Sequence, residues 1–286
     1  LSEEIAVLHE ELASKAYQHG PYAAFSLCDP KPRSIHKALV RDRLLHHAVY
    51  RILYIFFESR FVYDSYSCRN GRGTHKAIRR FELFARRVSK NNTRTCWVLQ
   101  CDVKKFFASI DHALLSEIVA RHGLEPDTLW LIQRIVTSFS SGEPGKGLPL
   151  GNLTSQLLVN VYMNELDQWM KHEMRVKHYI RYADDFVIFN EDRAVLEEML
   201  PKIDEFLWTK LKLTLHPNKV HIQTVASGVD FLGWVHFPDH RVLRTVTKRR
   251  MTRKLKETED VSVVNSYKGL MSHGNTRKLA KQLFPR

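Results

Sequence analysis

The sequence predicts an α+β fold, in which short antiparallel strands are combined with amphipathic helices. Apolar runs of strand length lie at residues 178–181 and 186–189, and the few residues between them favour a hairpin. A third strand-like run covers residues 95–102. Residues 35–58 instead repeat apolar side chains with helical spacing, and arginines stand between them. Strand patterns and helix patterns therefore share one chain.

The N-terminal third contains two further elements. Residues 3–17 begin as a helix with glutamates near its positive end, and a proline cluster between residues 21 and 32 ends it. A glycine-rich basic turn at residues 67–75 opens another helix that continues through Phe84. Backbone N–H groups and arginines in such a turn suit a triphosphate, although the turn is not a Walker loop.

The middle of the chain continues this alternation. After Asp102, either Ser109 or Asp111 caps a helix that stops at Gly123. A tight loop at residues 147–156 then enters an amphipathic helix of about twenty residues.

The C-terminal part begins with a helix over residues 194–207, followed by a strand and turn at 211–219. Residues 231–237 and 242–246 are predicted to form a second hairpin. The tail is basic and mainly helical, with interruptions at residues 264–269 and 273–275 before a final helix.

Three carboxylates stand out in this framework. Asp184 and Asp185 are adjacent at the predicted hairpin turn, where two ionised groups repel each other unless a cation lies between them. Taken alone, the pair is equally compatible with a solvated turn, because Asp is common in turns. Asp102 ends the third strand, and neighbouring strands in one sheet would bring all three acids together. Three oxygen donors suit two Mg²⁺ ions, with Mn²⁺ as the alternative, and in-line displacement by an attacking 3′-oxygen.

Composition bounds the class of protein. With 286 residues, 44% of them hydrophobic, the chain can bury a large core and form two or three lobes. Its four cysteines show no CxxC spacing, so the sequence suggests neither a zinc site nor disulfides. No apolar run reaches eighteen residues and no signal-peptide pattern is present, so we expect a cytoplasmic protein without a membrane partner.

Charge is divided by region. Residues 1–30 carry a net −4, residues 31–105 carry +13, residues 106–240 carry −6 and residues 241–286 carry +10. An acidic middle between two basic regions favours a metal-bearing centre between phosphate-binding walls. The alternative is a set of solvated helix faces, but the charge separates by region instead of alternating along single helices, which favours nucleic acid.

These residues resemble a reverse transcriptase, an RNA-directed DNA polymerase. Six blocks appear in that family's order: the basic loop, the Asp102 block, LPLGNLTSQ at 148–156, YADD at 182–185, a lysine turn and FLGW at 231–234. The resemblance implies a right-hand shape, with fingers, an antiparallel palm sheet with packed helices, and a short helical thumb. The expected boundaries are an N-terminal extension over 1–30, fingers over 31–95 with part of 120–147, a palm over 96–240 and a thumb over 241–286.

The resemblance also assigns roles. Asp102, Asp184 and Asp185 match the catalytic metal-binding acids, and Phe107 matches the aromatic residue that excludes a ribose 2′-hydroxyl, whereas Phe106 is expected in the core. The expected contacts to the incoming nucleotide are Arg69, Arg72, Leu150, Gly151, Gln156 and Lys219, the last as a proton donor or as a solvated turn lysine. The expected primer-positioning residues are Phe231, Leu232, Gly233 and Trp234, of which the tryptophan also suits a core position. The expected nucleic-acid contacts of the basic tail are Lys248, Arg249, Arg250 and Arg253.

One departure refines the comparison. Leu150 precedes Gly151 where many reverse transcriptases have Gln, and Ser155–Gln156 replaces Ser-Pro. This form resembles the enzymes of diversity-generating retroelements, which copy a template RNA with errors at adenines and work with a small basic accessory protein. An apolar side chain in place of an amide removes a hydrogen bond that could monitor base-pair geometry.

Expected partners are a template RNA, a DNA or RNA primer and deoxynucleoside triphosphates, in a bacterial, archaeal or phage-encoded setting. Group II intron, retron and phage-defence reverse transcriptases stay open as alternatives. A non-catalytic RNA-binding module is a further alternative from another class, but the presence of all three acids counts against it.

Overall fold

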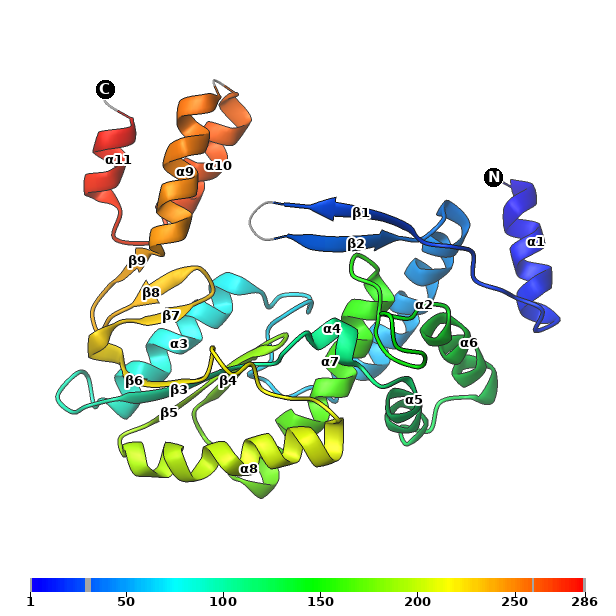
Figure 1. Ribbon diagram of the computed structural model, residues 1–286, viewed down its shortest axis with the longest axis horizontal. Coiled ribbons are helices and arrows are strands. Elements are labelled where there is room, and N and C mark those ends of the chain that lie inside the picture. The colour runs from blue at the N-terminus through cyan, green and yellow to red at the C-terminus, as the bar shows by residue number, and fades with distance from the viewer. Residues whose placement is uncertain (1, 29–31, 259, 285–286) are drawn as a thin grey trace.

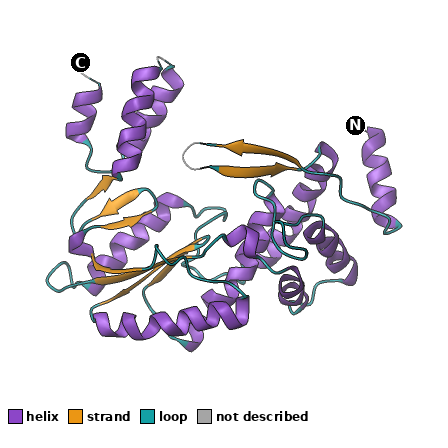
Figure 2. Cartoon of the chain, in the orientation of Figure 1, coloured by secondary structure: helices purple, strands orange, loops and turns teal. Residues whose placement is uncertain are grey.

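The computed structural model describes residues 2–28, 32–258 and 260–284, and it confirms the α+β class (Figures 1 and 2). The helices are α1 (Ser2–Ala13), α2 (Val40–Glu58), α3 (Thr74–Val88), α4 (Phe106–Ser109), α5 (His112–Ala120), α6 (Pro126–Thr137), α7 (Leu153–Gln168), α8 (Arg193–Leu211), α9 (Thr245–Glu257), α10 (Val261–Met271) and α11 (Arg277–Leu283). A π-helical turn, η1 (Trp169–Glu173), extends α7, and a 3₁₀ turn, η2 (Val225–Ser227), precedes β7. The strands are β1 (Ala23–Leu27), β2 (Arg33–Lys37), β3 (Trp97–Asp102), β4 (Tyr179–Tyr182), β5 (Asp185–Asn190), β6 (His221–Thr224), β7 (Val229–Phe231), β8 (Trp234–His236) and β9 (Arg241–Leu243).

The central sheet has the antiparallel strand order β4-β5-β3-β6. Because side chains alternate along a strand, each face builds its own core. Leu99 and Ile188 pack in the core that also contains the apolar residues of α8. Val98 and Val187 point to the other face, where the apolar residues of α3 cover them. Figure 1 shows α3 and α8 on opposite sides of this sheet.

The hairpin β1–β2 is a separate two-stranded sheet that reaches across the molecule toward α9 (Figure 1). Sequence analysis missed it, because β1 is exposed along its whole length and carries no buried alternation. The expected boundary between residues 30 and 31 lies outside the described residues. The strands on either side of it pair with each other, so the hairpin spans that boundary.

The three-stranded sheet β7-β8-β9 corrects one prediction. Residues 231–237 were expected to form one strand, but the chain reverses between β7 and β8 at Leu232 and Gly233. Their φ values of 52° and 86° are those of a tight hairpin turn that matches the twist of paired strands. The predicted hairpin about residues 238–240 is present as β8–β9.

Most predicted helices are confirmed, including the basic α9. The helix expected over residues 35–58 is present as α2, but it begins at Val40, because residues 35–37 belong to β2. The interruption predicted at residues 264–269 is wrong, because α10 continues through these residues to Met271, whereas the one predicted at 273–275 does separate α10 from α11. Packing against the C-terminal core outweighs the weak helix propensity of this segment, since Tyr267, Leu270 and Met271 all join that core. None of the helices in the described parts of the chain has the length and apolarity needed to cross a bilayer.

Candidate active site

The strand register brings the predicted acids together at one end of the central sheet. Asp102, the last residue of β3, is the direct cross-strand partner of Asp185, the first residue of β5. Asp184 lies between Tyr182 and Asp185 in the β4–β5 turn, where Ala183 has a φ of 56°. Asp102 and Asp185 are in register with Val98 and Val187, so both lie on the face that α3 and β7 cover.

The acids are crowded and largely withdrawn from water. Burial raises the pKa of Asp185 to about 7, and the carboxylates of Asp184 and Asp102 add to this effect. Burial also raises the pKa of Asp184, and Asp102 raises it further, while the cations Lys219 and Arg33 act in the opposite direction. Three like-charged groups share one small region, and a cation at this place would relieve their repulsion.

Lys219 supplies part of that positive charge. Its Nζ lies 2.7 Å from Oδ1 of Asp102, and the turn that carries it is tied to β3 by the His216 N–H, which donates to the Asp102 carbonyl. Among the described residues, no three His, Cys, Asp or Glu side chains are already arranged as a metal cluster. The oxygen donors nevertheless suit a hard divalent cation, provided that Lys219 releases Asp102.

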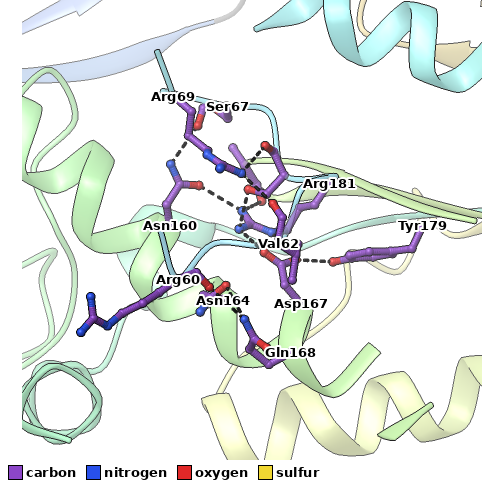
Figure 3. Close-up of polar contacts among 12 residues, drawn as sticks. Arg60, Val62, Ser67, Arg69, Asn160, Asn164, Asp167, Gln168, Tyr179 and Arg181 are labelled. Atoms are coloured by element: carbon purple, nitrogen blue, oxygen red, sulfur yellow. Dashed lines mark hydrogen bonds and ion pairs between the residues drawn. The ribbon is translucent and has the colours of Figure 1, made fainter. Parts of the chain in front are cut away.

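A buried polar network lies beneath the acid turn (Figure 3). Arg181 of β4 is 0% exposed, and its Nε and Nη2 donate to the two carboxylate oxygens of Asp167 at 2.8 and 2.6 Å. Its Nη1 donates to the Ala183 carbonyl at 3.0 Å, directly beside Asp184. Asp167 also accepts from the Tyr179 hydroxyl at 2.7 Å. Burial disfavours the charge of Arg181, but Asp167 outweighs burial and raises the pKa of Arg181.

The same network attaches the segment between α2 and α3 to the sheet. Ser65 forms a parallel bridge with Arg181, and its hydroxyl accepts from Nη2 of Arg181 at 3.1 Å. Asn160 of α7 accepts from Nη1 of Arg181 and donates to the Ser67 carbonyl at 2.9 Å. The acid turn is therefore positioned by residues from three separate parts of the chain.

Arg69 is engaged within this segment, contrary to the expectation of a triphosphate contact. Its Nε and Nη2 bond to Glu58, and its Nη1 donates to the carbonyls of Val62 and Ser65. With a side chain only 2% exposed, Arg69 holds the turn together. Arg72 is the more accessible of the two, and its guanidinium lies over the Tyr63 ring at 4.0 Å.

The loop before α7 meets both α4 and the β1–β2 hairpin. The Leu148 N–H donates to the carbonyl of the half-buried Phe107 at 2.8 Å, while Phe106 is in the core as predicted. The Leu150 carbonyl accepts from the His36 N–H at 3.0 Å, and the Asn152 amide donates to the His36 carbonyl at 2.9 Å. Gly151 lies between the residues that make these two bonds.

Gly151 has a φ of 107°, and a Cβ there would lie 2.8 Å from Cγ2 of Ile35. The glycine thus permits close approach of β2 to the loop. Gln156 is half-buried in the first turn of α7, where its N–H donates to the Asn152 carbonyl.

Arg33 is a site residue that sequence analysis missed. It begins β2, is exposed, and is close enough to lower the pKa of Asp184. The charge excess of residues 31–105 was the available signal, but that excess is spread over many cations. Only the hairpin brings this particular arginine to the acids.

The four FLGW residues divide between core and turn. Phe231 and Trp234 are 1% and 2% exposed and pack in two separate cores. The turn residues Leu232 and Gly233 remain partly accessible. The Gln100 amide donates to the Asp230 carbonyl at 2.7 Å, which ties β7 to the sheet face that carries Asp102.

The predicted basic residues of the tail lie on α9. Lys248, Arg249 and Arg253 are exposed, and Arg250 is half-buried. A hollow of about 620 Å³ is lined by Arg249, Arg250 and Arg253 and by Cys28, which follows β1. Cys28, directly after β1, and the basic residues of α9 therefore line one hollow.

The chain is similar to proteins of one known family. A family model described as reverse transcriptase (RNA-dependent DNA polymerase) matches residues 29–236, which is most of the chain. The chain belongs to the reverse transcriptase family. Members of this family use divalent metal ions, which agrees with the donor set formed by the three acids.

Two relatives illustrate the similarity. Protein YkfC of Escherichia coli is 28% identical over 288 residues, covering 85% of this chain and 72% of that protein. The group II intron-encoded protein LtrA of Lactococcus lactis is 24% identical over 295 residues, covering 78% of this chain. The chain spans only 46% of the length of LtrA.

Solved structures support the fold of this reverse transcriptase family member. Apo telomerase from Candida tropicalis superimposes with a TM-score of 0.59 at 10% identity, over 76% of this chain and 47% of that one. Telomerase from Candida albicans, in complex with a fragment of telomeric RNA, gives the same TM-score and identity over 87% of this chain and 54% of that one. The likeness shows the fold alone, which is that of a right-hand polymerase.

Proposed function

We propose that this chain copies RNA into DNA by joining an incoming deoxynucleoside triphosphate to the 3′ end of a primer. The observation that carries the proposal is the cross-strand register of Asp102 with Asp185, beside Asp184, within a family of RNA-dependent DNA polymerases. Burial raises the pKa of two of these carboxylates, which means that their charged forms are disfavoured in the folded protein. Clustering them is therefore unfavourable for folding, and perturbed groups of this kind are typical of functional sites.

We assign these three carboxylates to two Mg²⁺ ions, with Mn²⁺ as the alternative. Such ions activate the attacking 3′-oxygen and stabilise the leaving pyrophosphate when they are bound. The chain's own part is to hold acids from two strands at one point. Lys219, which bonds to Asp102 in the free protein, is then available as a proton donor near the leaving group.

Several side chains are assigned to the nucleotide. Phe107 is proposed to exclude a ribose 2′-hydroxyl, and its position beside the loop at Leu148 supports this. Leu150, Gly151 and Gln156 are proposed to line the nucleotide's sugar and base. For the triphosphate, the exposed Arg33 and Arg72 are better placed than Arg69, whose donors are engaged within the protein.

The primer and the template–primer duplex are assigned to the remaining surfaces. The accessible turn at Leu232 and Gly233 is proposed to position the primer end. Phe231 and Trp234 support that turn from their cores. The basic residues Lys248, Arg249, Arg250 and Arg253 of α9 are proposed to contact phosphates.

Two types of retroelement are consistent with this activity. Leu150 and Gln156 favour an error-prone enzyme of a diversity-generating retroelement, which would work with a basic accessory protein on the acidic surface of residues 106–240. The similarity to LtrA favours a group II intron enzyme as the second candidate. Both fit a cytoplasmic protein encoded by a bacterium, archaeon or phage.

Primer extension on an RNA template tests the activity. We expect synthesis with deoxynucleoside triphosphates and Mg²⁺, and its loss with a chelator or in Asp184→Asn. Asp192→Asn, which removes an exposed carboxylate at the start of α8, is the matched control and should extend normally. Equal extension by Asp184→Asn and wild type would overturn the assignment, and no extension by wild type would favour an RNA-binding module.

A further inference from the structure

Helix α3 has a basic face that the proposed polymerase cleft does not use. Its buried residues, which include Ala77, Phe81 and Ala85, pack against the central sheet and β7. At 100° per residue, the cations on the other side fall within an arc of about 100°. We call them the α3 basic face: Lys76, Arg79, Arg86 and Arg87, all exposed.

Nearby acids are already paired with other cations. Glu82 is bound by Arg241, and Asp64 is bound by Arg80 and Lys171. In the described residues, no ion pair is recorded for any cation of the α3 basic face. Their charge is therefore not neutralised within the protein, unlike that of α8, where lysines alternate with Asp204, Glu205 and other acids.

The pKa values of two histidines, one near each end of α3, are lowered by burial and by nearby cations. Burial lowers the pKa of His75, and His273, Arg79 and Arg241 lower it further. At the other end, burial lowers the pKa of His178, with added effects from Lys171, Arg87 and other cations. Arg79 and Arg87 of the α3 basic face therefore lie close to further positively charged side chains near the two ends of the helix.

The chemistry of this face distinguishes between classes of partner. Protein interfaces have apolar or aromatic centres depleted of charge, whereas Leu83, at 38% exposure, is the large apolar side chain exposed within this arc. Single-stranded nucleic acid is usually held by aromatic stacking, and the α3 basic face contains no aromatic residue. Paired RNA is recognised mainly through its shape, phosphates and 2′-hydroxyls, which suits arginines and lysines arranged along a rigid helix.

We propose that the α3 basic face binds the phosphate backbone of a double-stranded stem in the template RNA, outside the segment being copied. The proposal rests on the proposed function, because the uncopied part of an RNA template is the nucleic acid that stays outside the cleft. The fifteen residues of α3 span roughly 22 Å, enough to follow several phosphates along one stem. The Arg241–Glu82 contact joins this face to the base of the C-terminal helices.

Binding measured against salt concentration tests the inference. The probe is an RNA template–primer whose 5′ end continues into a stem-loop, and the reference probe ends at the copied segment. For Arg79→Gln/Arg86→Gln, we expect affinity for the stem-loop probe to fall about tenfold and the salt slope to fall by about 1.5, since each lost phosphate contact removes 0.7–0.9. The control Lys202→Gln/Lys210→Gln removes two exposed charges from α8 and should change neither.

The reference probe separates this inference from the proposed function. Binding and extension on that probe should be unchanged in Arg79→Gln/Arg86→Gln. An equal loss on both probes would place these arginines in the cleft and overturn the proposal. Unchanged binding of the stem-loop probe would also overturn it, leaving a solvated face or the docking site of an acidic protein. If wild type fails to extend the reference primer, the proposed function fails instead.

Discussion

Arg181 and Asp167 form an ion pair in which both side chains are 0% exposed, directly beneath the turn that carries Asp184. Arg181 also donates to the Ala183 carbonyl, so the pair is joined to the backbone of that turn. Removing water from two charges is costly, and a buried pair of this kind adds little stability by itself. Its geometry instead fixes where the acid turn lies.

Breaking this pair is predicted to destabilise the fold. Asp167→Asn leaves the charge of Arg181 buried and uncompensated, and we expect a loss of about 3 kcal/mol in the free energy of unfolding. Urea denaturation measures the change. Glu191→Gln is the control, because its ion pair with Arg94 is exposed on both sides and should contribute less than about 1 kcal/mol. Similar losses in the two variants would contradict a special role for the buried pair.

Stability without metal is predicted to fall as pH rises from about 4 to about 7, through the ionisation of Asp185. Its pKa is about 7 in the folded protein, whereas the ordinary pKa of an Asp side chain is 3.8, so between these values the folded state binds the proton and the unfolded state does not. Folding stability therefore decreases with pH in this window, by at most about 1.4 kcal/mol per pH unit.

Asp185→Asn removes this titration, so its stability should depend less steeply on pH than that of wild type. Thermal denaturation of both proteins from pH 5 to 8, with a chelator, gives the difference. Added Mg²⁺ should reduce the difference by favouring the ionised carboxylate. Parallel curves for the two proteins would exclude Asp185 as the titrating group.

Lys219 is predicted to compete with metal for Asp102 and to assist the reaction. In Lys219→Met we expect tighter Mn²⁺ binding by calorimetry, because the 2.7 Å ion pair is gone. Single-turnover primer extension should slow by about 10²-fold, the lower range for loss of a general acid. Lys212→Met removes a similar ion pair, to Asp111, and should leave both measurements unchanged. Weaker metal binding in Lys219→Met would refute competition.

Gly151 is predicted to control how closely β2 approaches the nucleotide loop. In Gly151→Ala the new methyl group meets Ile35, so the hairpin must shift, and we expect the KM for deoxynucleoside triphosphates to rise. Gly142→Ala is a close control, because Gly142 has a similar φ of 101° but open space around it. Both variants should lose about 1 kcal/mol through backbone strain, but only Gly151→Ala should change KM. Equal KM values for Gly151→Ala and Gly142→Ala would mean that β2 does not influence nucleotide binding.

Parts of the fold and site that depend on local patterns were predictable. The acids Asp102, Asp184 and Asp185 each follow or precede a short apolar run, and the length of those runs identifies the strands. The Leu232–Gly233 turn was missed, because a non-glycine residue with a φ of 52° leaves no mark in an apolar run. The partners of Arg69 were missed for another reason, because Glu58 lies in the preceding helix and the two carbonyls belong to a loop.

The features of the site that the sequence did not predict depend mainly on long-range polar contacts. Nothing in the sequence around Asp167 or Ser65 indicates that both meet Arg181, since the contacts join segments more than a dozen residues apart. The β1–β2 hairpin and Arg33 could not be predicted either, because exposed strands carry no buried alternation. Burial patterns thus predict cores and strand ends, whereas hydrogen-bond partners across the fold require the coordinates.

Leu150 is predicted to determine fidelity opposite adenine. It lies in the loop that β2 contacts, and its carbonyl is already bonded to His36, so the half-buried side chain is the part free to meet the nucleotide. Leu150→Gln adds an amide that can hydrogen-bond to a correctly paired nucleotide, and one such bond is worth about 0.5–1.5 kcal/mol. We therefore expect misincorporation opposite adenine to fall about 2- to 10-fold, as measured by sequencing the extension products.

The control for fidelity is Leu44→Gln, which places the same amide on the exposed side of α2 and should leave the error rate unchanged. Extension rates with correct nucleotides must be compared as well, because a variant that is merely slow also makes fewer errors per unit time. If Leu150→Gln extends normally and still misincorporates as often as wild type, residue 150 does not govern fidelity. The group II intron type would then be favoured, because the argument for an error-prone enzyme depends on this apolar side chain.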